Sequence, residues 1–326
     1  MNRKNTKPIA GTWVEFRHHN TAEGKYWNPA LERFTAAQWS EKLAEIAGLG
    51  MEFIVLMAAA LYERAYFKTN LFPPAETAVS DPLETLLTAA DETGLKVFVS
   101  NGFFGDWRRA GRNIRDREVI SKSLRAMSEI EALYSRHPSF FGWYLPDETC
   151  IIRHFGKPFL RYVNECAAEA RRLNKSRKIL IAPFGTNLVK ADAKFVRQLE
   201  GLDADFIAYQ DEVGVRKTKV ENSARHYEKL KTAHDKAGRA ALWADIELFD
   251  FEGLVYRSAL VPADFGRIQK QIEAVSPYVD KILCYQALGL MNKPGTSAFA
   301  GHPSSEALYN TYGQWLKNNE PAEDFS

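Results

Sequence analysis

Strand-like and helix-like segments alternate along this chain, and that alternation limits the folds it can adopt. Eight runs are rich in β-branched and aromatic residues, and amphipathic patterns with apolar positions three and four apart lie between them. The eight runs are residues 9–16, 52–59, 96–104, 140–146, 178–184, 205–210, 241–248 and 281–288. Strict alternation predicts an α/β fold with a parallel sheet, and eight is the number of strands that closes a (β/α)8 TIM barrel.

Helix boundary signals agree with this reading. Thr35 begins the pattern of a capping box, and Asp81 offers an N-cap followed by proline and glutamate. Gly50, Gly94 and Gly238 each come just before a predicted strand, where a helix must end and turn. The segmentation into helices and strands is therefore supported at both ends of several helices.

The connections after the strands favour a barrel over an open sheet. An open doubly wound sheet would need a glycine-rich phosphate loop after an early strand, and the sequence has none. Several strand-to-helix connections are long, namely 60–80, 102–116, 211–222 and 249–262, and in a barrel these build the active site. No low-complexity linker interrupts the pattern, so residues 1–326 are predicted to form one catalytic domain.

Composition narrows the classes of partner. The 43 basic and 41 acidic side chains of the 326 residues nearly cancel, so nothing favours nucleic acid as a ligand. No apolar run is long enough to span a membrane. The cysteines have no metal-ligand spacing, which predicts free thiols. The sequence as given predicts a cytoplasmic protein, or an exported one if a signal peptide has been removed. It leaves the oligomeric state open.

Acidic residues follow two strands that a barrel places across its lumen. Asp147 and Glu148 follow the run 140–146, and Glu247 closes the run 241–248, two residues after Asp245. Glycoside hydrolysis needs two carboxyl groups, roughly 5–5.5 Å apart for retention and roughly 6.5–9.5 Å apart for inversion. The sequence leaves that separation open, but it makes Glu148 and Glu247 the candidate catalytic pair. Solvation or helix capping is the alternative role for such acids.

The motifs around these acids resemble those of known barrel glycosidases. The chain is similar to the large retaining clan that includes cellulases, β-galactosidases and β-mannanases, with PDE at 146–148 and DIE at 245–247. It also resembles, in the stretch GWYLPDE, a bacterial family of glycosidase-like barrels, the DUF4434 type. The resemblance implies that Glu148 is the acid/base, that Glu247 is the nucleophile, and that the enzyme cleaves an oligo- or polysaccharide with retention.

One position departs from the clan. The clan usually has asparagine before its acid/base glutamate, whereas this chain has Asp147. A charged neighbour would raise the pKa of Glu148, which suits a general acid, but Asp147 could itself be the proton donor. Which of the two carries the proton stays open at this stage.

The other predicted site residues are polar or aromatic side chains at strand ends or in the following loops. Aromatic rings suit the apolar faces of sugars, although loop aromatics also form small cores of their own. The resemblance implies that Tyr209 holds the nucleophile, unless it is a core tyrosine. The predicted substrate-binding residues are Glu15, Arg17, Trp27, Tyr62, Asn101, Trp107, Asp147, Tyr209, Asp211, Glu212, Asp245, Tyr285 and Gln286.

The expected partner is a carbohydrate, either neutral or anionic, and no cofactor or metal is expected. Basic residues in the loops, such as Arg108 and Arg109, would favour a uronate or sulfated sugar unless they are simply solvated. One alternative is a metal-dependent sugar isomerase or epimerase that collects Glu148, Asp211, Glu212 and a histidine from 18–19. Another is a barrel that binds glycans without catalysis.

Overall fold

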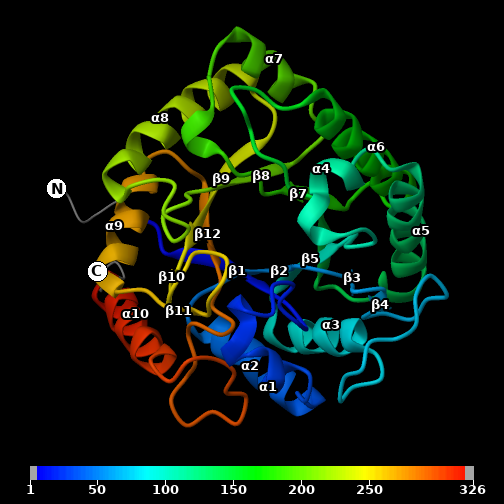
Figure 1. The fold of residues 1–326 in the computed structure, drawn as a ribbon, viewed down its shortest axis with the longest axis vertical. Coiled ribbons are helices and arrows are strands. Elements are labelled where there is room, and N and C mark those ends of the chain that lie inside the picture. The colour runs from blue at the N-terminus through cyan, green and yellow to red at the C-terminus, as the bar shows by residue number, and fades with distance from the viewer. Residues whose placement is uncertain (1–5, 320–326) are drawn as a thin grey trace, which may run out of the picture.

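The computed structural model describes residues 6–319, and eight parallel strands in it close into a barrel (Figure 1). The predicted extent 1–326 includes residues 1–5 and 320–326, which lie outside this description. In chain order the barrel strands are β1 (Ile9–Val14), β2 (Phe53–Leu56), β5 (Lys96–Ser100), β6 (Phe140–Tyr144), β7 (Lys178–Ile181), β8 (Phe206–Gln210), β9 (Ala241–Glu247) and β12 (Lys281–Tyr285). The predicted (β/α)8 fold is confirmed.

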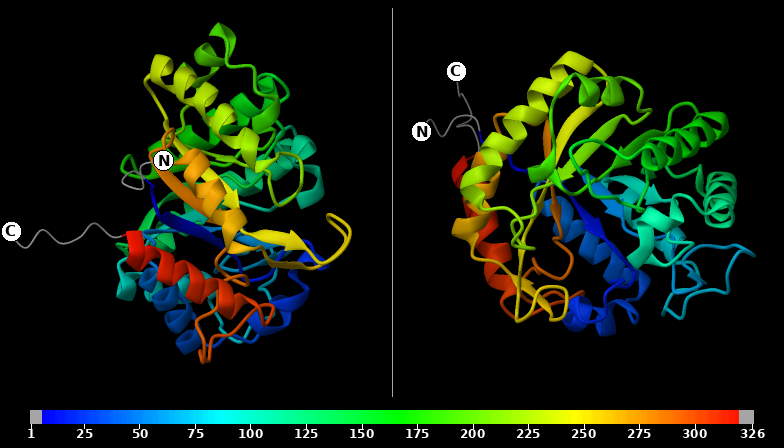
Figure 2. Two further views of the ribbon diagram at one scale, coloured as in Figure 1. Left: turned by 90° about the vertical axis from the view of Figure 1, so that its left-hand side faces the viewer. Right: turned by 45° about the horizontal axis from the view of Figure 1, so that its top comes forward.

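Helices form a ring outside the barrel, one principal helix after each strand (Figures 1 and 2). The predicted boundary signals are present. Thr35 and Gln38 make a complete capping box, Asp81 caps its helix through the backbone N–H of Glu84, and Gly94 ends that helix in a left-handed conformation. The principal helices are α2 (Ala36–Gly48), α3 (Pro82–Thr93), α5 (Arg117–Tyr134), α6 (Lys157–Leu173), α7 (Ala193–Glu200), α8 (Val220–Ala237), α9 (Phe265–Val275) and α10 (Ser305–Asn319).

Aromatic side chains fill the N-terminal end of the barrel. Phe206 stacks on Trp243 with ring centroids 4.3 Å apart, and Phe53 lies 5.1 Å from Trp243. Phe98 and Phe141 pack edge to face at 5.2 Å. Because this layer plugs the lower half of the barrel, only the C-terminal end of the strands is left for a site.

The loops at that end carry most of the remaining structure. Two small hairpins are present, β3 (Ala60–Leu61) with β4 (Arg64–Ala65), and β10 (Phe249–Phe251) with β11 (Leu260–Pro262). The short helices are η2 (Glu23–Tyr26), α1 (Asn28–Leu31), η3 (Trp107–Arg109), α4 (Ala110–Asn113) and η4 (Thr186–Leu188). Several predicted strands extend too far, because their last residues leave the sheet to form these loops. No described helix combines the length and hydropathy needed to cross a membrane.

Candidate active site

A cavity of about 590 Å³ lies at the C-terminal ends of the barrel strands. Its wall is formed by acidic, basic and aromatic side chains from most of the strand-to-helix loops. The acidic residues are Glu23, Glu148, Glu212, Asp245 and Glu247, the basic ones are His19, Arg108, Arg109 and Lys217, and the aromatic ones are Trp13, Trp107, Phe184, Phe249, Phe251, Tyr256 and Tyr285.

Glu148 lies at the wall of this cavity, four residues beyond Tyr144 at the end of β6. The Tyr144 hydroxyl donates to Oε1 of Glu148, and Gln210 Nε2 donates to Oε2 at 2.5 Å. Gln210 is itself fixed by a bond to the carbonyl of Ala182 at 2.9 Å. Burial raises the pKa of Glu148 to about 7, with a further contribution from Asp147. Such a carboxyl group can hold a proton near neutral pH.

Asp147 does not share this position. Its side chain is buried, does not line the cavity, and accepts a hydrogen bond from Asn113 Nδ2 at 2.7 Å. Burial raises its pKa to about 6, against the opposing effect of the Asn113 bond. Of the two adjacent acids, Glu148 is therefore the one that a ligand in the cavity can reach.

Replacing Asp147 with asparagine should stabilise the protein at alkaline pH. A carboxyl whose folded pKa is raised favours folding only while it is protonated, and that contribution is lost as pH rises through about 6. The unfolding free energy of D147N minus that of the wild type should rise by about 1–3 kcal/mol between pH 4 and pH 8. Urea denaturation at both pH values measures it, with D250N as the control. A pH-independent difference would contradict the raised pKa of Asp147.

Glu247 ends β9 and lies nearly buried in the same cavity. Val215 N–H donates to its Oε2 at 2.8 Å, and its own N–H donates to Asp211 Oδ1 at 3.2 Å. Asp211 in turn accepts from Gln271 Nε2 at 2.6 Å. Burial raises the pKa of Glu247 well above its usual value and the charge of Asp211 raises it further, whereas the Val215 bond lowers it. The carboxylate of this residue is thus held by Val215 in the cavity wall, and its backbone by Asp211 behind that wall.

A third carboxyl group, that of Asp245, faces the cavity one inward position before Glu247 on β9. It is 3% exposed. Burial raises its pKa well above the usual value, and the charges of Glu148 and Glu247 raise it further. Burial and the two neighbouring carboxylates therefore favour the acid form of Asp245.

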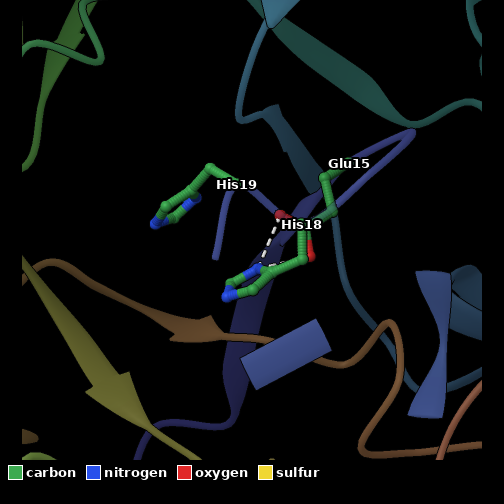
Figure 3. A group of neighbouring side chains, drawn as sticks. All are labelled: Glu15, His18 and His19. Carbon is green, nitrogen blue, oxygen red and sulfur yellow. Dashed lines mark hydrogen bonds and ion pairs between the residues drawn. The ribbon is translucent and has the colours of Figure 1, made fainter. Parts of the chain in front are cut away.

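A buried ion-pair network lies beside the cavity at the end of β1 (Figure 3). His18 Nδ1 lies 2.8 Å from Glu15 Oε1, and its Nε2 lies 3.1 Å from Glu23 Oε2. Although burial opposes its charge, Glu15 raises the pKa of His18 to about 9. His19 stacks against His18 with centroids 4.5 Å apart, and burial together with the charge of His18 lowers its pKa to about 3.

Potential ligand atoms of Glu15, His18 and His19 all lie within 4.8 Å of one another, a spacing that could hold a metal ion. Both ring nitrogens of His18 already contact carboxylates, however, so this histidine would have to give up an ion pair to bind a metal. The metal set suggested by the sequence does not assemble: Asp211 does not line the cavity, and Glu212 accepts the backbone N–H groups of Gly185 and Thr186.

The structure brings some of the predicted site residues to the cavity and places others behind it. Besides the two candidate catalytic glutamates, four predicted residues line the cavity: Trp107, Glu212, Asp245 and Tyr285. Nine others do not line it: Glu15, Arg17, Trp27, Tyr62, Asn101, Asp147, Tyr209, Asp211 and Gln286.

Several of these nine support the wall instead. Glu15 accepts from Trp27 Nε1 at 2.9 Å and from Gln286 Nε2 at 2.8 Å. Arg17 pairs with Glu32 at 2.8 Å. The Tyr62 hydroxyl donates to the carbonyl of His19. Asn101 is buried against the sulfur atoms of Met127 and Cys166. These side chains hold the loops that carry the cavity residues.

Tyr209 corrects one prediction directly. Its hydroxyl lies 3.0 Å from His234 Nε2 on α8, so it does not hold Glu247. Side chains along a strand alternate between the lumen and the helices, and Tyr209 takes the outward position while Gln210 points inward. The sequence reasoning missed Gln210, Tyr144 and Trp13. Strict counting of this alternation could have found Gln210 and Trp13, but the irregular register between β5 and β6 breaks the count before Tyr144.

The fold and cavity define a (β/α)8 barrel protein with paired glutamates after its fourth and seventh strands, and solved glycoside hydrolases share this fold. A Bacteroides thetaiotaomicron protein provisionally assigned as an α-L-fucosidase superposes with a TM-score of 0.78 at 15% identity, covering 97% of this chain and 95% of its own. An endo-β-1,4-mannanase from Thermotoga petrophila gives 0.63 at 12% identity, covering 98% and 78%. A GH2 β-galacturonidase from Eisenbergiella tayi, bound to galacturonate, gives 0.59 at 14% identity, covering 95% and 51%.

Residues 9–298 match the family described as a domain of unknown function, DUF4434. The chain belongs to this family. A search of curated proteins found no sequence match. The structural likenesses, at these low identities, establish the fold and leave the chemistry to be argued from the residues.

Proposed function

We propose that this protein is a glycoside hydrolase that cleaves a glycosidic bond in an oligo- or polysaccharide. The observation that carries the proposal is that Glu148 and Glu247, from strands on different sides of the barrel, line one cavity. Each is held by donors that fix its carboxyl group, and the raised pKa of Glu148 suits a proton donor. Binding alone would not require two such carboxyl groups. The shared fold with solved glycosidases supports this reading.

In the proposed mechanism the two glutamates act in succession. Glu148 in its acid form protonates the leaving oxygen while the ionised Glu247 attacks the anomeric carbon, giving a glycosyl ester and the released alcohol. Glu148, now ionised, takes a proton from water as that water attacks the anomeric carbon and releases Glu247. Val215 N–H stabilises the ionised Glu247, and the charge of Asp147 helps Glu148 to keep its proton between turnovers.

The charge of the cavity rim affects whether the protein can bind an anionic sugar. Arg108 and Arg109 line it, whereas Arg17 is paired elsewhere. Arg108 is bound to Asp106 by two hydrogen bonds of 2.9 and 3.0 Å, and Lys217 lies 3.4 Å from Glu212. The basic groups are thus partly neutralised. A sugar with a carboxylate, as in the galacturonate complex of the Eisenbergiella tayi protein, would have to point this group at the rim to meet them.

Hydrolysis of a panel of aryl glycosides, neutral and uronic, from pH 4 to 9 tests the proposal. At least one glycoside should be hydrolysed, and kcat/KM should fall as pH rises through about 7, where Glu148 loses its proton. It should also fall at low pH, where Glu247 becomes protonated. Assays at two salt concentrations show how much the charge of the basic rim contributes to kcat/KM for uronic glycosides, because salt screens exposed charges. A protein that binds these sugars but hydrolyses none at any pH would be a non-catalytic barrel.

A further inference from the structure

Two side chains on the inner wall of the cavity carry buried polar atoms without hydrogen-bond partners. Trp13, on β1, is 1% exposed, and its Nε1 makes no hydrogen bond of normal geometry, although it is near enough to the Tyr144 hydroxyl to lower the pKa of that tyrosine against the larger rise caused by burial. Asp245, on β9, is 3% exposed, and its Oδ1 has no partner. Both residues line the cavity with Glu148 and Glu247. Because buried polar groups are nearly always paired, two such groups in the wall of one cavity point to a bound molecule as their partner.

The position of these atoms places that molecule next to the candidate catalytic pair. Asp245 precedes Glu247 by two residues on the same strand, so both point into the barrel. The Trp13 ring packs edge to face on Tyr144, whose hydroxyl contacts Glu148. A molecule in contact with Trp13 and Asp245 therefore lies between Glu148 and Glu247.

The chemistry of the two groups selects a hydroxyl-bearing ligand. An indole N–H can only donate, whereas a carboxyl group in its acid form can donate or accept. Burial and the neighbouring carboxylates favour the acid form of Asp245. An anionic substituent would add a negative charge beside Glu148 and Glu247 in a poorly solvated place, which is unfavourable. A neutral hydroxyl can pair with both groups.

We propose that Trp13 and Asp245 bind neighbouring hydroxyl groups of the sugar residue held between Glu148 and Glu247, and that they determine which sugar is accepted. The inference rests on the proposed function only for the location of the scissile bond. A carboxylate or sulfate on the substrate would lie at the opposite, basic rim near Arg108 and Arg109.

Calorimetric titration of the intact protein with glucose, galactose, mannose, fucose, glucuronate and galacturonate tests this assignment. The wild type should bind at least one of them, and W13F and D245A, which lack the polar group, should each weaken that binding roughly tenfold or more. Against a deoxy sugar that lacks the contacted hydroxyl, the wild type and the matching variant should bind equally.

Trp143 provides a matched control. Its Nε1 is also buried without a partner, but the residue packs against Phe140 and does not line the cavity. W143F therefore makes the same chemical change at a site that a sugar cannot reach, and it should leave sugar affinity within about twofold of the wild type. Thermal unfolding of all three variants verifies that each is folded at the temperature of the titration.

Three results would overturn the inference: no binding of any sugar in the set, unchanged affinity in W13F and D245A, or equal weakening by W143F. These outcomes are separable from failure of the proposed function, because affinity is measured without turnover. If the protein hydrolyses a glycoside but substitutions at Trp13 and Asp245 leave sugar affinity unchanged, only this inference is rejected. Binding that depends on them, without hydrolysis of any glycoside, would reject only the proposed enzyme.

Discussion

Replacing Glu247 with glutamine or alanine should lower kcat/KM for the best glycoside by at least about 10⁴-fold, because the variant has no group to form the glycosyl ester. Glutamine keeps the size of the side chain and can still accept from the Val215 N–H, so the loss would reflect the missing nucleophile rather than altered packing. The measurement is steady-state hydrolysis of the aryl glycoside that the wild type cleaves fastest.

Two controls make this result specific. D250N changes a nearby carboxyl group that lies outside the cavity and pairs with Arg267, so its kcat/KM should stay within about threefold of the wild type. Azide should restore turnover to E247A, because a small anion can take the place of the missing carboxylate and form a glycosyl azide of inverted configuration. Activity of E247Q within tenfold of the wild type would remove Glu247 from the mechanism.

Replacing Glu148 with glutamine should produce an effect that depends on the leaving group. Glycosides with poor leaving groups need protonation and should lose about 10²–10⁴-fold in kcat/KM. Glycosides with strongly acidic phenols as leaving groups should form the ester almost normally and then accumulate it, because Glu148 is also needed to activate water. A burst of phenol followed by slow turnover is the expected time course.

The pH dependence of kcat/KM shows whether Glu148 or Asp147 is the proton donor. In E148Q the fall of kcat/KM near pH 7 should vanish, since the group that titrates there has been removed. In D147N that fall should persist at slightly lower pH, because the charge of Asp147 raises the pKa of Glu148. An unchanged alkaline limb in E148Q, or its loss in D147N, would make Asp147 the proton donor.

The architecture follows from short-range patterns in the sequence. Runs of β-branched and aromatic residues mark the barrel strands, and capping residues such as Thr35 and Asp81 act within their own helices. The ends of strands were less predictable. Residues 102–104 and 286–288 continue the composition of a strand, but they leave the sheet because their backbones turn into the loops that form the cavity. Residue composition alone does not predict where the chain leaves the sheet.

The candidate site was predictable to the extent that it depends on the ends of strands. Glu148 and Glu247 could be placed because the fourth and seventh strands of a barrel, which two other strands separate, end at the same open end of one lumen. Glu15 has a comparable place at the end of β1, yet it turns to His18 and Trp27. That choice depends on which partner lies nearest in three dimensions. Trp13 and Tyr144 lie within predicted strands and were not predicted as site residues. The role of their polar atoms becomes apparent only when the structure places them near the carboxyl groups.

Covalent trapping tests directly whether Glu247 forms a glycosyl ester. The wild type is incubated with the 2-deoxy-2-fluoro analogue of its best aryl glycoside, carrying a good leaving group, and the peptides are analysed by mass spectrometry. If Glu247 is the nucleophile, each protein molecule should release one phenol and carry one sugar on Glu247, and E247Q should carry no label. A label on another residue, or hydrolysis that inverts the anomeric centre without any adduct, would contradict the proposed double displacement by Glu148 and Glu247.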